Sequence, residues 1–398
     1  MKRSLLEKEA ASWVEEGIIS REQYEQIIKR YPNRNSRGLL TIFGGLFIGL
    51  GFLTFVASNW SFMPNILKMG ILIVSLLGFY FFGERAYQRG SKALGTSFYA
   101  IGVLLFGESM ILTGQMYHYM SYSATTFFLW GVAALLVYMA RREQPLLYLT
   151  FAILTVGQIY SWMTYGEAHL GIFLLFVMGG GFELVRLRRD FLALLYGFGY
   201  VLQSLVLVFA GGHDYVWLLF LWLLLYVASN LSIFRFPSLQ ITSIGAAFLL
   251  KAIEVFLLDS WVMERWDVNV TFLIVHIVLT GLLVLLVKDR TIGVLNLLLF
   301  LPIVYVGGNA GVIALVLLYV LSVGYLIIGT KRESIGLVNF GTGAFLVSTL
   351  IAYVQLAWDF LNKSVFFFIG GILLFGLSYV LNRERRRLSG YEKGGGFR

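Results

Sequence analysis

The chain is a series of long apolar stretches separated by short polar gaps. From about residue 39 onward each stretch holds roughly twenty residues with few charges, which is the length an α-helix needs to cross a bilayer. The pattern therefore predicts an all-α, polytopic integral membrane protein of about fourteen transmembrane helices. The predicted spans are residues 39–58, 66–82, 94–114, 122–140, 146–163, 168–185, 191–210, 215–233, 238–258, 268–287, 291–306, 310–329, 335–358 and 365–381.

The positive charges supply the orientation, because they occupy alternate gaps. All but four of the 31 Lys and Arg residues fall in the first 38 residues, in every second gap, or in the C-terminal tail. The four exceptions are Lys68, Lys251, Arg265 and Lys363. Since loops on the cytoplasmic side carry the excess of Lys and Arg, this alternation predicts a multi-pass protein with both termini in the cytoplasm.

Composition agrees with a membrane protein and excludes several chemistries. Hydrophobic residues make up 58% of the 398 residues and charged residues 13%, half of what a soluble domain carries. The net charge of +9 is spread over the gaps, so we expect no nucleic-acid partner. Cysteine is absent, which excludes disulfides, thiolate metal sites and thiol catalysis.

Residues 1–38 are the polar part of the chain and predict a short cytoplasmic helical hairpin. Gly17 is placed to end a first helix. Ser20 and Gln23 have the spacing of a capping box at the start of a second one. The predicted organisation is thus the hairpin at 1–38, a transmembrane bundle at 39–381 and a basic cytoplasmic tail at 382–398. A polar start also predicts that there is no cleavable signal peptide.

The eleventh and twelfth spans leave two alternatives open. Pro302 and the glycine-rich run 307–311 are consistent with a tight external turn between two ordinary spans. The same residues are equally consistent with a broken, re-entrant pair of helices, and discontinuous helices line the sites of transporters.

The N-terminal region resembles a known family. The hairpin sequence from Trp13 to Tyr24 is followed by a glycine-rich run at 44–51. The first predicted span ends in Ala57-Ser58-Asn59-Trp60. Over about the first 90 residues this is similar to a family of predicted prokaryotic membrane proteins named for an N-terminal domain of unknown function. The resemblance implies an inner-membrane location and assigns no activity, so it carries no catalytic residues.

Polar side chains inside the predicted spans are the candidates for function. Ionisable groups are costly in a bilayer and usually face the interior of a bundle or a water-filled cavity. We predict substrate- or proton-handling roles for six of them: Glu108, Lys251, Glu254, His276, Gln115 and Gln158. Most of them fall in the outer half of the membrane by this topology. The alternative is that these residues have structural roles. Lys251 and Glu254 would then form an ion pair that holds two helices together, and the other side chains would make interhelical hydrogen bonds.

Two of these candidates, Gln115 and Gln158, lie in two segments of the chain that resemble each other. Residues 113–121 align without gaps to residues 156–164, and the alignment superimposes Gln115 on Gln158. Such self-similarity indicates a fold grown by duplicating two-span hairpins, although coincidence in an aromatic-rich, Gly-rich chain is the alternative. No nucleotide-binding loop or zinc motif occurs, and the four histidines lie in different segments, so we expect no cofactor and no metal site.

These features favour transport or flipping of a small or amphipathic solute. The expected partners are membrane lipid and a small-molecule or lipid-linked solute. A second hypothesis is a non-catalytic scaffold or sensor that acts through the hairpin on a cytoplasmic protein. A third is a membrane enzyme on a lipid-linked substrate, with Glu108 or Glu254 as base and His118 as its partner; the short external gaps make it less favoured.

Overall fold

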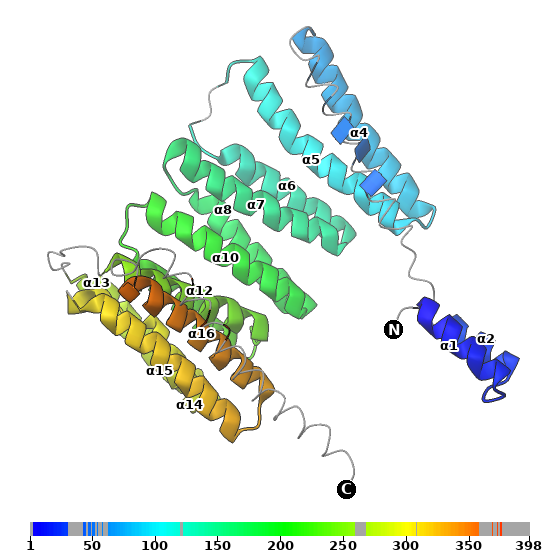
Figure 1. The fold of residues 1–398 in the computed structure, drawn as a ribbon. Coiled ribbons are helices and arrows are strands. Elements are labelled where there is room, and N and C mark those ends of the chain that lie inside the picture. The colour runs from blue at the N-terminus through cyan, green and yellow to red at the C-terminus, as the bar shows by residue number, and fades with distance from the viewer. Residues whose placement is uncertain are drawn as a thin grey trace. The chain divides into compact units, whose positions relative to one another are not determined.

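The computed structural model describes residues 3–30, 63–119, 122–258, 268–307 and 309–357, with isolated positions between 43 and 58 and between 368 and 375. Within these ranges the chain is helical and contains no strand (Figure 1). Its contacts divide it into two units, Met1–Met120 with Ala133–Leu149, and Ser121–Val132 with Thr150–Arg398. The predicted spans 39–58 and 365–381, and the tail 382–398, lie outside the continuously described residues.

The first unit begins with the predicted hairpin, formed by α1 (Arg3–Glu15) and α2 (Arg21–Arg30). Gly17 has a φ of +73°, the left-handed conformation that lets glycine follow a helix end. The capping box is also present: the Gln23 amide N–H donates to Ser20 Oγ (3.2 Å), and the Ser20 amide N–H donates to Gln23 Oε1 (2.9 Å). The local signals in the sequence are therefore sufficient to set this turn.

The same unit contains two long helices, α4 (Asn65–Gln88) and α5 (Lys92–Met116), which pack as an antiparallel pair. Their close approach depends on glycine. A Cβ at Gly95 would lie 3.0 Å from the carbonyl oxygen of Gly83 and closer still to the Tyr87 ring. Parts of α6 (Thr125–Arg141) and α7 (Gln144–Tyr165) complete the unit.

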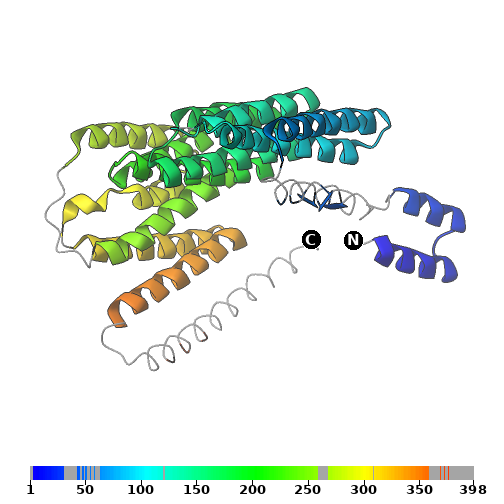
Figure 2. The same ribbon diagram turned by 90° about the horizontal axis from the view of Figure 1, so that it is seen from above.

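The second unit holds the remaining helices (Figures 1 and 2). They are α8 (Leu170–Leu174), the π-helix η2 (Leu175–Gly180), α9 (Gly181–Leu187), α10 (Asp190–Ala210), α11 (Val216–Asn230), α12 (Pro237–Leu257), α13 (Val270–Leu286), α14 (Arg290–Leu297), the 3₁₀ turns η3 (Leu298–Phe300) and η4 (Ile303–Val306), α15 (Ala310–Lys331) and α16 (Ile335–Ala357). Helices α10 and α11 pack on α12, α12 packs on α15, and α15 packs on α16.

Two contacts show that α10 and α12 run parallel. Asp190 accepts hydrogen bonds from the backbone and the hydroxyl of Ser238 (3.2 and 2.5 Å). Two turns further along, Gly197 lies against Thr242, where a Cβ would come within 2.3 Å of the hydroxyl oxygen. The register is thus fixed by a polar contact at one end and by the absence of a side chain in the middle.

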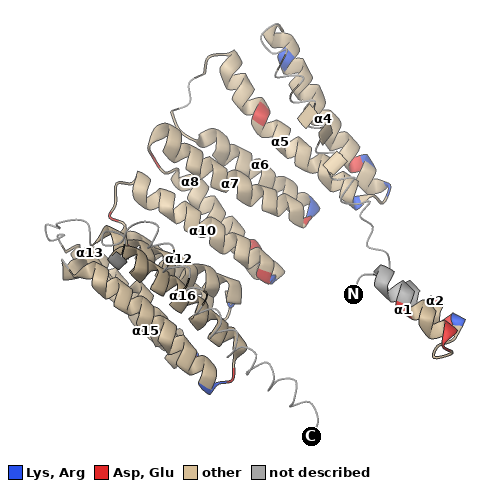
Figure 3. Ribbon diagram, viewed as in Figure 1, with Lys and Arg blue, Asp and Glu red and all other residues tan. Residues whose placement is uncertain are grey.

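Most helices agree with the predicted spans, and eight of those described are long and apolar enough to cross a membrane. Four shorter apolar helices accompany them: Thr125–Arg141, Val216–Asn230, Val270–Leu286 and Arg290–Phe300. Lys, Arg, Asp and Glu gather toward helix ends, leaving long uncharged stretches between them (Figure 3). The count of fourteen remains a prediction, since two spans fall outside the continuously described ranges.

The predicted span 291–306 is not one continuous helix. Helix α14 ends at Leu297, a 3₁₀ turn follows, and the backbone becomes extended at Leu301. Pro302 has no N–H to continue the ladder, and its φ of −79° and ψ of 77° are those of an inverse γ-turn. The eleventh span is therefore interrupted, whereas the twelfth is the continuous helix α15 (Ala310–Lys331), so the described residues show one broken helix and not a broken pair. A re-entrant arrangement stays a prediction.

Candidate functional site

The centre of the second unit is an ion pair between Lys251 and Glu254 on α12. The ammonium donates to Glu254 Oε2 over 2.6 Å, and both side chains are buried, with exposed fractions of 0% and 2%. The spacing of three residues puts both groups on one face of the helix, as predicted from the sequence. Burying two charges costs several kcal/mol per ion, and their attraction offsets this cost only where the geometry is good and further hydrogen bonds are made.

The ammonium has a second acceptor at the helix break. Lys251 Nζ donates to the carbonyl oxygen of Leu301, the residue before Pro302. The same oxygen accepts the backbone N–H of Ile303 over 3.0 Å, which closes the γ-turn. The unwound backbone therefore offers a carbonyl to a side chain in the interior of the bundle, as the broken helices of transporters do.

His276 on α13 joins this group. Its ring stacks on Phe272 with centroids 5.1 Å apart and interacts with the backbone of Phe300 and electrostatically with Lys251. Its Nδ1 is buried and accepts no hydrogen bond from the described residues. The structure thus brings together three of the six predicted residues, Lys251, Glu254 and His276.

Glu254 also interacts with a tyrosine hydroxyl. Its Oε1 is buried and has no hydrogen-bond partner of normal geometry among the described residues. The hydroxyl of Tyr215, directly before α11, interacts with the same carboxylate, and Tyr215 in turn interacts with Tyr305 of η4. Neither tyrosine was singled out from the sequence, because both look like ordinary interfacial aromatics there.

A second polar cluster, which the sequence did not indicate, binds α14 to α11 and α15. The Asn296 amide nitrogen donates to the Tyr226 hydroxyl (2.9 Å), and the Tyr325 hydroxyl donates to Asn296 Oδ1 (2.7 Å). Tyr226 also stacks on Phe300, with centroids 5.8 Å apart. The sequence contains one indication of this cluster, because Asn296 is a polar amide in the middle of an apolar stretch.

Gln158 on α7 lies elsewhere in the unit, and a second buried amide, Gln203, lies on α10. Phe151 and Tyr196 pack with ring centroids 6.2 Å apart, as do Trp162 and Phe209 at 6.4 Å, so these two helices run parallel. The glutamines follow Phe151 and Tyr196 by seven residues each, which returns them to the same faces two turns further along. Both are fully buried, and neither amide has a hydrogen-bond partner among the described residues.

The remaining candidates, Glu108 and Gln115, lie on α5 in the first unit. Glu108 is half-buried, and Gln115 is exposed in the last turn of the helix. The internal similarity therefore aligns an exposed amide with a fully buried one. His118, the proposed enzyme partner, is also exposed and has a φ of 52°.

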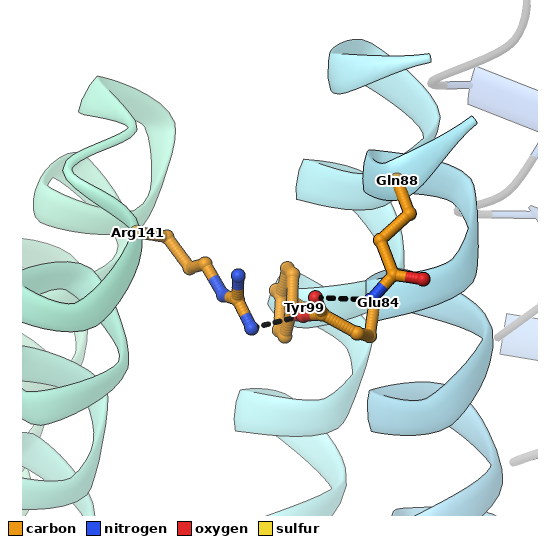
Figure 4. A network of polar contacts seen from close by, with 4 residues as sticks. All are labelled: Glu84, Gln88, Tyr99 and Arg141. Atoms are coloured by element: carbon orange, nitrogen blue, oxygen red, sulfur yellow. Dashed lines mark hydrogen bonds and ion pairs between the residues drawn. The ribbon is translucent and has the colours of Figure 1, made fainter. Parts of the chain in front are cut away.

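The first unit has a polar network of its own at the end of α4 (Figure 4). Glu84 accepts hydrogen bonds from the Tyr99 hydroxyl (2.6 Å), from Gln88 (3.0 Å) and from Arg141, with which it also forms an ion pair. The Arg141 guanidinium lies 4.6 Å from the centre of the Tyr99 ring, a cation–π distance. The residues belong to three helices, so the network ties their ends together.

Within the described ranges, no group of three or more His, Asp and Glu side chains is arranged to hold a metal ion. The Lys251 group instead contains one ammonium that donates to the Glu254 carboxylate and to the Leu301 carbonyl. Chemically it is suited to binding a hydrogen-bonding group or to moving a proton.

The fold and these buried polar groups define a polytopic α-helical membrane protein. Residues 11–147 match the family model described as predicted membrane protein (DUF2157), which confirms the resemblance to a membrane-protein family defined by a domain of unknown function. The match extends beyond the first 90 residues and includes the Glu84 network. Neither the curated proteins nor the solved structures contain a match to the chain.

Proposed function

We propose that the protein is a carrier that transports or flips a small or amphipathic solute, with Lys251, Glu254 and His276 as its solute- or proton-handling groups. The observation that carries the proposal is the fully buried Lys251–Glu254 pair hydrogen-bonded to the carbonyl of a broken helix. Membrane lipid and a small-molecule or lipid-linked solute are the proposed partners.

The physical argument for a functional role is the free-energy cost of burying an ion pair. A buried ion pair of this kind is often no more stable than an apolar replacement of the same volume, so stability alone gives little reason to keep it. Ionisable groups within membrane spans mark substrate, ion and proton pathways. A discontinuous helix adds a backbone carbonyl at the same place, which is how secondary transporters build their sites.

The test is Lys251→Ala in a strain whose own copy of the gene is deleted. The variant is expected to lose complementation or solute uptake when its expression is adjusted so that its membrane level matches that of the wild type. Lys68→Ala is the matched control, because Lys68 is a buried lysine of the first unit, on α4, and lies outside the proposed site. Full activity of Lys251→Ala would refute the carrier proposal.

The location and orientation are part of the proposal. We place both termini in the cytoplasm because the basic gaps alternate along the chain, and we take the prokaryotic inner membrane from the family resemblance. Single cysteines introduced into this Cys-free chain at Arg142 and at His213 test it directly. A membrane-impermeant maleimide applied to intact cells is expected to label position 213 and to spare position 142.

The hairpin supports a second candidate function, that of a sensor or scaffold with a cytoplasmic protein partner. Its turn is set by a capping box and a left-handed glycine, and it carries the exposed Ile18. Deletion of residues 1–35 separates the two candidates. Loss of function with the membrane helices intact would favour the sensor, and retained function would exclude it.

A further inference from the structure

We infer that Gln158 of α7 and Gln203 of α10 form a binding site for a small uncharged solute that carries hydroxyl groups. The inference deepens the proposed function, on which it rests, because it names the chemical class of the solute. The residues that carry it come from the start of α6 and from α7, α8, η2 and α10, and all of them belong to the second unit.

The two glutamines lie at the same level of two parallel helices. Phe151 of α7 and Tyr196 of α10 are in ring contact, with centroids 6.2 Å apart, and each glutamine follows its aromatic residue by seven positions. Two turns of helix return a side chain to nearly the same face. The helix ends match as well, because Tyr165 and Ala210 each lie seven residues beyond the glutamine of their helix. This places both amides at one depth of the interface, about 10 Å inside the helix ends.

Both amides are buried without hydrogen-bond partners among the described residues. Each residue has an exposed fraction of 0%, and neither Nε2 nor Oε1 of either side chain is bonded. Such groups in a native protein are otherwise satisfied, so this pair requires an explanation. A carboxamide donates and accepts hydrogen bonds and carries no charge, and a hydroxyl does the same. Two enclosed amides at one level are therefore complementary to a small uncharged hydroxyl compound.

The side chains around this level are aromatic, and one of them comes from an irregular helix. Phe176 lies in the π-helix η2, and its ring centroid is 5.3 Å from that of Tyr196 and 5.1 Å from that of Phe151. It also packs on Gly199, one turn before Gln203, where a Cβ would come within 2.5 Å of the ring. π-Helical turns are rare and frequently occur at functional sites. The negative faces of aromatic rings attract the polarised C–H groups of sugars and polyols, so they suit the same class of solute.

Further polar groups lie at the same end of these helices. Gly157, next to the glutamine of α7, packs on Phe127, since a Cβ there would lie 2.6 Å from that side chain. This contact places the start of α6 beside the glutamine. Two residues before Phe127, Thr125 Oγ1 lies 3.5 Å from Nε2 of His169, the residue that caps α8. The hydroxyl and the imidazole offer hydrogen bonds to a solute that enters from this end, which is the outer end in the proposed orientation.

Glycerol is the probe, because it is a small uncharged polyol. Thermal unfolding of the purified full-length protein in detergent is followed with and without about 100 mM glycerol, since a ligand of the folded state shifts unfolding by mass action. Glycerol is expected to raise the midpoint by a few degrees more in the wild type than in the double variant Gln158→Leu with Gln203→Leu. The response of the double variant measures the general stabilising effect of a polyol that is excluded from the protein surface.

Gln115→Leu is the matched control. It removes an amide that is exposed on α5, so it is expected to respond to glycerol as the wild type does. Equal shifts in the wild type and in the double variant would overturn the inference. If the double variant were then also less stable than the wild type, the amides would be assigned to an ordered water instead.

Cross-linking in membranes tests the placement of the amides and does not depend on the folding of the leucine variants. The chain has no cysteine, so Gln158→Cys with Gln203→Cys provides a single reactive pair. A bifunctional maleimide that spans about 8–10 Å, the usual distance between the axes of packed helices, is expected to join them. The control pair is Gln158→Cys with Ala193→Cys, since Ala193 is equally buried on α10. It lies about 15 Å from Gln203 along the helix. Absence of the first cross-link, or equal yields for the two pairs, would overturn the inference.

The outcome is separate from that of the carrier proposal. Lys251→Ala is expected to keep the specific response to glycerol, because Lys251 lies on α12, outside the amide site. A specific response in the wild type together with full activity of Lys251→Ala would keep the amide site and refute the role of Lys251 in the carrier.

Discussion

The ammonium of Lys251 donates to the carbonyl of Leu301, fifty residues further along the chain, at the position where Pro302 interrupts a helix. This hydrogen bond joins the C-terminal third of the membrane helix α12 to a segment that is not regularly helical. It places the buried ion pair and the helix break, which the sequence presents separately, at one point.

The first prediction concerns the stability of the ion pair. Lys251→Met is expected to lower the free energy of unfolding by about 3–5 kcal/mol, because it leaves the Glu254 carboxylate buried and unpaired. The double substitution Lys251→Met with Glu254→Leu is expected to recover most of that loss. Chemical unfolding in detergent measures both. Additive losses in the double variant would show that the two side chains do not act as a pair.

The second prediction concerns the hydrogen bonds that Asn296 of α14 makes with Tyr226 and Tyr325. Asn296→Leu is expected to cost about 2–4 kcal/mol of stability, because it leaves the buried hydroxyls of Tyr226 and Tyr325 without their partner. Tyr319→Phe is the matched control, since its hydroxyl makes only a long 3.3 Å contact with Thr349. Unfolding of the two variants is compared under the same conditions. Equal stabilities would contradict the role given to Asn296.

The third prediction separates structure from function at the buried amides. Gln203→Leu is expected to raise stability by about 1–2 kcal/mol, because the amide is fully buried with no hydrogen-bond partner among the described residues. Gln158→Leu is expected to do the same, whereas Gln115→Leu on the exposed end of α5 is expected to change little. If the carrier uses the two amides, both stabilised variants also lose uptake. A loss of stability in either would show that its amide is satisfied.

The fourth prediction concerns pH. The guanidinium of Arg332 donates two hydrogen bonds to Asp289, at the N-terminus of α14, and this holds the pKa of the carboxyl below its ordinary value of 3.8. A carboxyl whose pKa is lowered by folding stabilises the protein above its unfolded pKa, and this stabilisation is lost as pH falls through the folded pKa.

Arg332→Ala is therefore expected to be less stable than the wild type at neutral pH. The difference is expected to disappear when both proteins are measured well below pH 3.8, where the carboxyl is protonated in each. Thermal unfolding across this range provides the measurement, with Lys331→Ala as a control on charge alone. A difference that persists unchanged in acid would refute the assignment to Asp289.

The sequence determined the class of protein and much of its local structure. Twenty-residue apolar stretches predict helices in a membrane because every backbone polar group must be satisfied within its own segment. The turn of the hairpin followed from Gly17 and the Ser20–Gln23 pair, which act over three or four residues. The ion pair between Lys251 and Glu254 followed from helical spacing for the same reason.

Only the tertiary structure decided what those side chains meet. Membrane helices are uniformly apolar, so the sequence pattern gives little information on which face of each helix is buried and against which neighbour. The contacts of Lys251 with Leu301, of Asn296 with Tyr226 and Tyr325, and of Glu84 with Arg141 join residues far apart in the chain. The interruption of the helix at Pro302 was likewise not determined by the sequence, since proline is compatible with a tight turn between two helices and with a break inside one.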